Sequence, residues 1–321
     1  MTGLDPATRP TLYFIGVTTG SSSIMQVFPA WAAHLGLHDA TIRGIDFPLH
    51  APTAAYQDTV AFLKADPLSR GALVTTHKLD LFAACSAQFD RIDPHAALMQ
   101  EVSCLSKPAG VGLAASAKDP LAAGLALDGF LPPGQFAAGA GELFVIGAGG
   151  SARAITWHLT RPERGADRPA RVSVSDIDAH RLDAVQQMHA RLGHGVPVRT
   201  VHVTGPDGND ACLHALPPGS LVVNATGLGK DRPGSPIGAA VFPSRTIVWD
   251  MNYRGTLDFL HQARRQQDAR SLQVEDGWSY FIHGWSQVIA EVFEIPIDGR
   301  GPLVTDLSRL AGALRLRTQA A

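Results

Sequence analysis

The sequence predicts a two-domain α/β protein in which a parallel-rich sheet forms the centre of each domain. Apolar runs typical of buried strands alternate with segments of helical periodicity over most of the chain, which favours parallel strands joined by helices. One apolar run, 143–146, leads directly into a glycine-rich stretch and then into a helical segment. The length of 321 residues is sufficient for two domains of ordinary size.

The N-terminal domain is expected over residues 1–118. Its first, second and third strands end at glycine or polar residues, and a segment with helical spacing follows each of them. Two shorter strands complete the predicted sheet. The expected strands are 11–16, 41–46, 71–75, 101–105 and 111–115, and the expected helices are 24–35, 53–63 and 79–85.

The second domain is expected over residues 119–276, and the dipeptide Asp119-Pro120 is a good start signal for a crossover helix over 121–130. Six strands follow, which is the number in a full dinucleotide-binding fold; they are 143–146, 171–175, 198–203, 221–223, 246–250 and 271–274. A helix is predicted over 179–192 and another over 257–265. Residues 277–321 form two further amphipathic helices, 277–293 and 306–316, which we expect to pack back on the N-terminal domain.

The glycine-rich stretch has the composition of a turn that binds a pyrophosphate. It consists of Gly147, Ala148, Gly149, Gly150, Ser151 and Ala152. Glycines permit the tight turn and the close approach of backbone to phosphate, and the N-terminus of the following helix attracts negative charge. A small residue such as Ala152 lets helix and strand pack closely. The second domain is therefore predicted to be a Rossmann-type dinucleotide-binding domain.

The choice of cofactor depends on Asp176, which stands at the end of the next predicted strand, 29 positions after Gly147. A carboxylate there accepts hydrogen bonds from a ribose hydroxyl and repels a 2′-phosphate. No arginine follows this strand directly, and Arg181 lies one helical turn too far to decide the matter. The sequence predicts NAD in preference to NADP.

Composition excludes several other functions. The formal net charge is −2, and no long basic run is present, so we expect no nucleic-acid partner. The start lacks a signal-peptide pattern and no apolar stretch approaches a bilayer span, which predicts a cytoplasmic protein with no membrane partner. Three scattered cysteines indicate reduced thiols. His34 and His38 have a helical ligand spacing but no third ligand nearby, so we expect no metal site.

Lys78 and Asp119 are the candidate chemical pair. Each stands at the beginning of a helix that follows a predicted strand, where ligands of open α/β sheets bind. Together they could transfer a proton or hold a substrate oxygen with an ammonium group. The residues by themselves also fit a solvated lysine and a helix N-cap.

The order of motifs resembles the shikimate and quinate dehydrogenase family over nearly the whole chain. The shared pattern comprises serines after the first strand, a Thr…Lys motif after the third, an Asp opening the crossover helix, Gly-Ala-Gly-Gly-x-x-Arg-Ala, Asn-Ala-Thr, Asp-x-x-Tyr and Asp-Gly. The resemblance implies that Lys78 and Asp119 form the catalytic dyad. It further implies a substrate site that includes Ser21, Ser23, Thr75, Ser103 and Tyr253, and a cofactor site that includes Asn224, Thr226 and Gly277 beside the glycine turn.

The chain departs from the family pattern on the substrate side. The family's Asn-Val-Thr-x-Pro-x-Lys is replaced by residues 73–78, Leu-Val-Thr-Thr-His-Lys, and its Asn-Thr pair by Ser103-Cys104. The expected glutamine of the return helix aligns with Gly284, with Gln287 as a shifted stand-in. A buried pocket that lacks two hydrogen-bonding side chains should not hold the same polyol equally well.

These residues predict an oxidoreductase that interconverts an alcohol and a ketone on a hydroxylated cyclic carboxylic acid. Two alternatives stay open: an NAD-binding sensor without this chemistry, and a family enzyme with another small-metabolite substrate. The partner is a small molecule in each reading. The sequence leaves a homodimer open, since it does not determine the oligomeric state.

Overall fold

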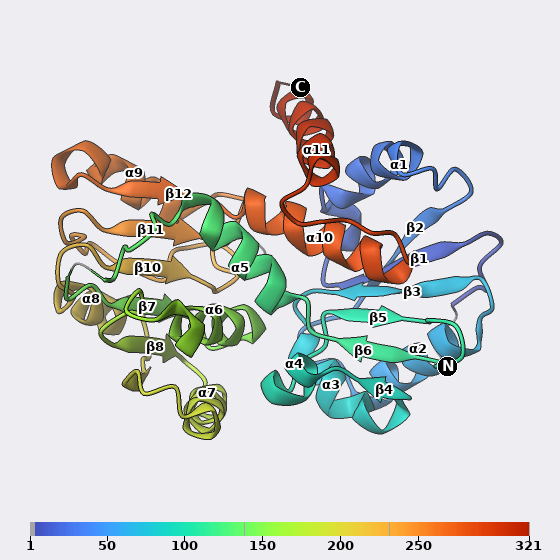
Figure 1. The fold of residues 1–321 in the computed structure, drawn as a ribbon, viewed down its shortest axis with the longest axis horizontal. Helices are drawn as coiled ribbons and strands as arrows, with labels where there is room; N and C mark the ends of the chain where they lie inside the picture. The colour runs from blue at the N-terminus through green and yellow to red at the C-terminus, as the bar shows by residue number, and fades with distance from the viewer. Residues whose placement is uncertain (1–3, 138, 231, 321) are drawn as a thin grey trace. The chain divides into compact units, whose positions relative to one another are not determined.

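The computed structural model describes residues 4–137, 139–230 and 232–320 of the chain. The chain folds into two compact units (Figure 1). Unit 1 comprises residues 1–122 and 282–321, and unit 2 comprises residues 123–281. The two-domain α/β prediction is confirmed.

Unit 1 is built on a six-stranded sheet with the order β2-β1-β3-β5-β6-β4. Its strands are β1 (Thr11–Gly16), β2 (Thr41–Asp46), β3 (Ser69–Val74), β4 (Arg91–Ile92), β5 (Cys104–Ser106) and β6 (Ala114–Ser116). The helices in its first part are α1 (Ile24–His34), α2 (Thr53–Ala65), α3 (Lys78–Cys85) and α4 (Pro94–Met99). Strands β2, β1 and β3 are parallel, as the alternation of strand and helix predicts.

Strand β5 is the exception to the parallel pattern. It runs antiparallel to both of its neighbours, with Cys104 opposite Leu73 of β3 and Ser116 of β6 (Figure 1). The strand that was predicted over 101–105 begins only at Cys104. The prediction missed β4 and α4 because both are very short. Since β5 is reversed, its beginning meets the ends of β3 and β6 at one edge of the sheet.

The last part of the chain completes unit 1 with α11 (Pro302–Ala320) and most of α10 (Trp278–Val292). Trp285 of α10 packs edge-on against Phe14 of β1, with ring centroids 4.9 Å apart. The indole of Trp31 donates a hydrogen bond to the carbonyl of Leu307, 2.8 Å away. Burial of these aromatic faces holds the C-terminal helices on unit 1.

Unit 2 contains six parallel strands in the order β12-β11-β10-β7-β8-β9, which is the strand order of a Rossmann fold. They are β7 (Leu143–Ile146), β8 (Val172–Asp176), β9 (Val198–His202), β10 (Leu221–Asn224), β11 (Ile247–Asp250) and β12 (Gln273–Glu275). The helices are α5 (Asp119–Phe130), α6 (Gly150–Thr160), α7 (Ala179–Leu192), α8 (Pro206–His214) and α9 (Asp258–Arg270). All six predicted strands are present, whereas the short α8 was not predicted.

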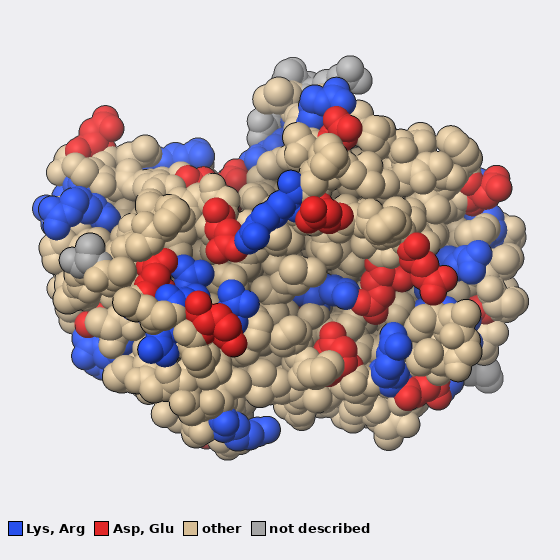
Figure 2. Space-filling view, viewed as in Figure 1, with Lys and Arg blue, Asp and Glu red and all other residues tan. Residues whose placement is uncertain are grey.

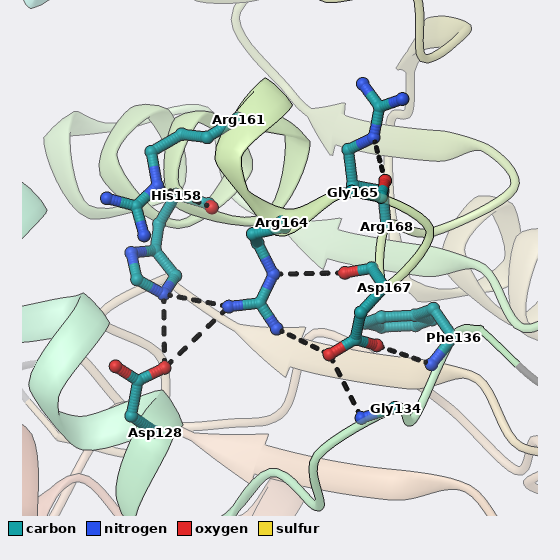
Figure 3. A network of polar contacts seen from close by, with 9 residues as sticks. All are labelled: Asp128, Gly134, Phe136, His158, Arg161, Arg164, Gly165, Asp167 and Arg168. Atoms are coloured by element: carbon teal, nitrogen blue, oxygen red, sulfur yellow. Dashed lines mark hydrogen bonds and ion pairs between the residues drawn. The ribbon is translucent and has the colours of Figure 1, made fainter.

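A polar network joins two helices and two loops of unit 2 (Figure 3). His158 of α6 lies 3.5 Å from the carboxylate of Asp128 on α5, and Arg164 lies 3.7 Å from the same carboxylate. Arg164 also pairs with Asp167, which accepts a hydrogen bond from the Gly134 N–H. Burial lowers the pKa of His158 to about 4, with the nearby arginines acting in the same direction, so the imidazole is neutral at pH 7.

The divisions between the units fall inside helices α5 and α10, at 122/123 and 281/282. The sequence placed them at 118/119 and 276/277, where these helices begin. A helix carries no composition signal at the point where its packing partner changes, so only tertiary contacts locate such a division.

On the face shown in Figure 2, basic and acidic side chains are interspersed, and no extended area has a single charge sign. Within residues 4–137, 139–230 and 232–320, no helix combines the length and apolar character that crossing a bilayer requires.

Candidate active site

Lys78 and Asp119 meet at the edge of the unit 1 sheet where β3 and β6 end. Lys78 is the first residue of α3, and its backbone N–H donates to the Thr75 carbonyl at 3.2 Å. Asp119 is the first residue of α5, three positions after β6. The Lys78 ammonium and the Asp119 carboxylate form an ion pair whose side chains are 15% and 7% exposed. The structure therefore brings together the two residues that the sequence proposed as a pair.

Opposing effects act on the charge of Lys78. Burial works to lower the pKa of this lysine, while the negative charges of Asp119 and Glu101 raise it, and the pKa lies above the ordinary value. Lys78 is thus an ammonium at neutral pH. An ammonium in this position can donate a hydrogen bond to a substrate oxygen and stabilise negative charge that develops on it.

Thr75 and Ser103 lie at the same edge. The Thr75 hydroxyl donates to the Ile15 carbonyl at 3.2 Å, which fixes the loop between β3 and α3. The Ser103 hydroxyl oxygen accepts from the Lys118 N–H at 2.7 Å, immediately before Asp119. Ser103 is 3% exposed. Its hydroxyl anchors the backbone next to the dyad, in the position where the family has an asparagine.

The serines after β1 occupy the turn that begins α1. Ser21 is exposed, and its hydroxyl donates to the Thr18 carbonyl at 2.9 Å. Ser23 is half-buried at the N-cap position of α1 and makes no capping hydrogen bond through its side chain. Both lie beyond the C-terminal end of a sheet strand, where ligands of such sheets bind.

Gln287, suggested as a shifted stand-in for the family glutamine, makes a hydrogen bond within unit 1. It is 8% exposed, and its amide donates to the Ile297 carbonyl at 3.2 Å. The side chain therefore fastens the segment that follows α10. At Gly284 a Cβ atom would meet nothing within 4 Å, so the family's glutamine position holds no side chain here.

The glycine turn of unit 2 has the backbone that a pyrophosphate requires. Gly147 has φ +103°, and a Cβ there would lie 2.9 Å from the Ala225 carbonyl oxygen, so only glycine fits. At Gly149 a Cβ would meet nothing within 4 Å, which leaves the approach to the backbone open. Helix α6 begins at Gly150, and its first-turn N–H groups have no acceptor within the helix. The turn fits a dinucleotide.

Ser151 and Ala152 occupy the first turn of α6 and have different surroundings. Ala152 is fully buried, as expected for the small residue that lets the helix pack on the sheet. The Ser151 hydroxyl lies 3.1 Å from the Tyr280 hydroxyl. The packing of Ala152 and the contact of Ser151 with Tyr280 therefore hold this first helical turn within unit 2.

Asp176 ends β8 beside the glycine turn. One carboxylate oxygen accepts from the Ala148 N–H at 2.6 Å, and the other accepts from the Asp178 N–H at 2.9 Å. Arg181 pairs with Asp178 at 3.5 Å. The acid is therefore fixed in orientation, and the arginine that could neutralise a 2′-phosphate has an acidic partner of its own.

Asn224 and Thr226 shape the turn that follows β10. Asn224 is fully buried; its amide nitrogen donates to Asp250, and its oxygen accepts from both the N–H and the hydroxyl of Thr226. Burial raises the pKa of Asp250 to about 7, while Asn252 and Asn224 act against the shift. Both polar atoms of Asn224 are thus used inside the protein, and Asp250, the acid of the Asp-x-x-Tyr motif, is buried at a strand end.

Tyr253 and Gly277 also lie in unit 2. The Tyr253 ring packs against Phe281 and Trp278, with centroids 4.7 Å and 5.5 Å away. A Cβ at Gly277 would lie 1.9 Å from the Met251 carbonyl oxygen, so glycine is required where α10 starts. Among the residues that the structure describes, no three His, Cys, Asp or Glu side chains gather in a way that could hold a metal ion.

Known proteins similar to this chain are dehydrogenases. The chain matches no protein-family model. It is 28% identical over 275 residues to shikimate dehydrogenase (NADP(+)) of Methylobacterium radiotolerans, covering 85% of this chain and 88% of that enzyme. It is 32% identical over 144 residues to the shikimate dehydrogenase (NADP(+)) of Streptococcus gordonii, where the match spans 44% of this chain and only 47% of that enzyme.

A solved structure has the same fold over almost the whole length. Quinate dehydrogenase from Corynebacterium glutamicum, in complex with NAD, superimposes with a TM-score of 0.69, covers 95% of this chain and 99% of its own, and is 20% identical. The fold of both units, the glycine turn and the match to the Methylobacterium radiotolerans enzyme over most of its length all indicate the same kind of protein. The chain is thus similar to shikimate dehydrogenases in sequence and shares its fold with a quinate dehydrogenase.

Proposed function

We propose that the protein interconverts an alcohol and a ketone on a hydroxylated cyclic carboxylic acid, with unit 1 binding the substrate and unit 2 the cofactor. The observation that carries the proposal is the ion pair of Lys78 and Asp119, placed at the strand edge where the sheet of unit 1 ends. Its relatives include shikimate dehydrogenases, and a quinate dehydrogenase has its fold.

Lys78 is the group that acts on the reacting oxygen. As an ammonium it donates a hydrogen bond to the carbonyl oxygen and supplies the proton as that oxygen becomes a hydroxyl. Asp119 orients the ammonium and holds its charge. In the opposite direction the hydroxyl proton passes to neutral Lys78, and because the pKa of Lys78 is raised, this neutral form becomes abundant only at alkaline pH.

The bound cofactor supplies the hydride acceptor or donor. Residues of the glycine turn would hold its pyrophosphate through backbone N–H groups at the start of α6. Asp176 would accept hydrogen bonds from a ribose hydroxyl through the lone pairs that its two backbone bonds leave. We infer that NAD is preferred over NADP, because Asp176 and Asp178 would repel a 2′-phosphate and Arg181 is paired.

A substrate other than shikimate or quinate is the second candidate within the same reaction class. The absence of a side chain at Gly284 and the internal bond of Gln287 favour it. Ser21, Ser23 and Thr75 of unit 1 keep their proposed roles at the substrate, while Ser103 has a shorter polar side chain than the family asparagine.

The test is to follow NADH formation at alkaline pH with shikimate, quinate and related cyclic hydroxy acids, with NADP⁺ in parallel. Turnover with at least one of them, faster with NAD⁺ than with NADP⁺, is the expected result. Tight NADH binding without turnover on the whole panel would instead support the sensor. We also infer a cytoplasmic location, which the free thiols of Cys85, Cys104 and Cys212 favour.

A further inference from the structure

Glu291, the second-last residue of α10, contacts three polar residues of unit 1. One carboxylate oxygen, Oε1, accepts a hydrogen bond from the Ser106 hydroxyl at 2.7 Å and another from the Ser116 hydroxyl at 2.9 Å. The other oxygen, Oε2, forms an ion pair with the Lys118 ammonium. Lys118 immediately precedes Asp119 in the chain, so this carboxylate joins α10 to the segment that carries the dyad aspartate.

The sheet of unit 1 presents the two serines to the same carboxylate oxygen. Ser116 is the last residue of β6 and lies opposite Cys104 of β5, while Ser106 lies opposite Ala114. Side chains two positions apart on a strand point to the same face, so both hydroxyls lie on one side of the sheet. The carboxylate of Glu291 therefore bridges the neighbouring strands β5 and β6.

Tertiary contacts hold this carboxylate at a helix end that disfavours it. The last turn of a helix carries a partial negative charge, which repels a carboxylate. Burial also acts to raise the pKa of Glu291, but the charge of Lys118 and the serine hydroxyls lower it below the ordinary value. Burial acts to lower the pKa of Lys118, and Glu291 raises it above the ordinary value. Both partners are therefore charged at neutral pH.

Two residues, Ala117 and Lys118, connect the end of β6 to the start of α5. The Ala117 N–H donates to the Asp93 carboxylate at 3.3 Å, and the Lys118 N–H donates to the Ser103 hydroxyl at 2.7 Å. Glu291 adds a contact to the side chain of Lys118. This link is thus held at its backbone and at one side chain, and α5 begins directly after it.

We propose that Glu291 is a positioning residue of the catalytic centre, which fixes Lys118 against the sheet and thereby holds Asp119 in its contact with Lys78. A displacement of about 1 Å in a catalytic group can cost about 100-fold in rate. The backbone bonds of the link remain when Glu291 is replaced, so its loss should weaken the contact rather than abolish it. The inference rests on the proposed role of the dyad in the reaction.

The direct test follows the Lys78 amine by NMR and needs no substrate. The chain has five lysines, so protein carrying ¹³C at the lysine Cε atoms gives few signals, and the Lys78 signal is assigned by its loss in Lys78→Met. Burial acts to lower the pKa of Lys78 and the charge of Asp119 raises it. The titration midpoint of this signal therefore reports how closely the carboxylate is held to the amine.

Lys118→Met and Glu291→Gln break the same ion pair but change the local charge in opposite directions. If these residues acted on Lys78 through charge alone, Lys118→Met would raise the midpoint and Glu291→Gln would lower it. The proposal expects a lower midpoint in both, by about one pH unit, because Asp119 is no longer held against the amine. An equal or higher midpoint in Lys118→Met overturns the proposal.

The double variant, Lys118→Met with Glu291→Gln, removes the pair without leaving an unpaired charge, so it carries the test if Lys118→Met alone does not fold. The two lost charges cancel, and the proposal still expects a lower Lys78 midpoint; an unchanged midpoint overturns it. The matched control is Asp90→Asn, which breaks the ion pair of Lys64 with Asp90 in unit 1 and should leave the Lys78 midpoint in place.

A kinetic readout separates positioning from stability. Glu291→Gln keeps an oxygen that can accept from the two serines, and it should lower kcat about tenfold through the displaced aspartate. The KM for the dinucleotide should stay the same, because the proposed cofactor site lies in unit 2. A residue that only stabilised the fold would lower the urea midpoint of unfolding and leave kcat in place.

The failure of this proposal differs from the failure of the proposed function. Lowered NMR midpoints without turnover on any substrate of the screen would support the positioning of Asp119 by Glu291 and count against the proposed function. Turnover with a Lys78 midpoint that Lys118→Met does not lower would count against Glu291 alone.

Discussion

The Lys78 ammonium pairs with the Asp119 carboxylate although the two residues lie 41 positions apart in the chain. The pair forms because β3 and β6 end at the same edge of the sheet, with β5 reversed between them. Each strand is followed by a helix, and each residue is the first of its helix. The position of both side chains is therefore set by long-range strand pairing.

Replacement of Lys78 by methionine should lower kcat by about 10²–10⁴-fold, because the group that exchanges a proton with the substrate oxygen is lost. Asp119→Asn should lower kcat less, since the amine remains. Steady-state assays on the best substrate of the screen measure both. The control is Lys64→Met, which removes a more exposed lysine paired with Asp90. Equal activity in Lys78→Met and Lys64→Met would refute the dyad.

Two alanine substitutions in the glycine turn should have different effects. Gly149→Ala should change the free energy of unfolding by less than about 0.5 kcal/mol, since its Cβ has open space. It should nevertheless weaken NADH binding about tenfold, because the methyl group occupies the approach to the pyrophosphate. Gly147→Ala should destabilise the protein by about 1–3 kcal/mol through its positive φ and the contact with Ala225. Chemical unfolding and NADH fluorescence titration separate the two effects.

Asp176→Asn should reduce the preference for NAD. Removing the charge leaves a side chain that still bonds a ribose hydroxyl but no longer repels a 2′-phosphate. The ratio of kcat/KM with NAD⁺ to that with NADP⁺ should fall about tenfold, which corresponds to about 1.4 kcal/mol. Asp183→Asn, which changes an exposed acid of α7, serves as the control. A ratio that stays the same in Asp176→Asn would argue against this acid as the selector.

Lowering the pH should reduce the stability of unit 2, because His189 is buried in its neutral form. This side chain is 8% exposed, its Nε2 lies 2.9 Å from the Thr156 hydroxyl, and burial lowers its pKa to about 4. The unfolded chain, with a histidine pKa of about 6.5, binds more protons between these values, so stability falls as the pH falls from 6.5 towards 4. At pH 5 the loss from this residue is about 2 kcal/mol.

The measurement is urea unfolding at pH 7 and pH 5 for the unaltered protein and for His189→Gln. The variant should lose less stability between the two pH values. Part of the pH dependence should persist in it, because the pKa of His158 is also lowered to about 4. His214→Gln, at an exposed position, is the control. The assignment fails if His189→Gln and the unaltered protein show the same difference between pH 7 and pH 5.

Much of the fold was predictable because its signals are local. Strands β7, β10 and β11 each carry an apolar run, β8 has alternating apolar residues, and helix 179–192 has its predicted limits. The misses are β4 and α4, which are too short for a periodic pattern to appear, and α8, whose sequence Pro206–His214 contains few apolar residues. The antiparallel direction of β5 could not be predicted either, because the residue pattern of a three-residue strand does not indicate in which direction it runs.

The sequence by itself predicted the glycine turn and Asp176, since each depends on residue type and on spacing within one strand-turn-helix segment, and the order of motifs pointed to Lys78 and Asp119 as a candidate pair. Only the tertiary structure decided that Ser103 anchors the backbone before Asp119 and that Gln287 is held by the segment after α10. The physical reason is that strand pairing and burial join segments far apart in the chain. Charge and hydrogen-bond partners at the site follow from those pairings.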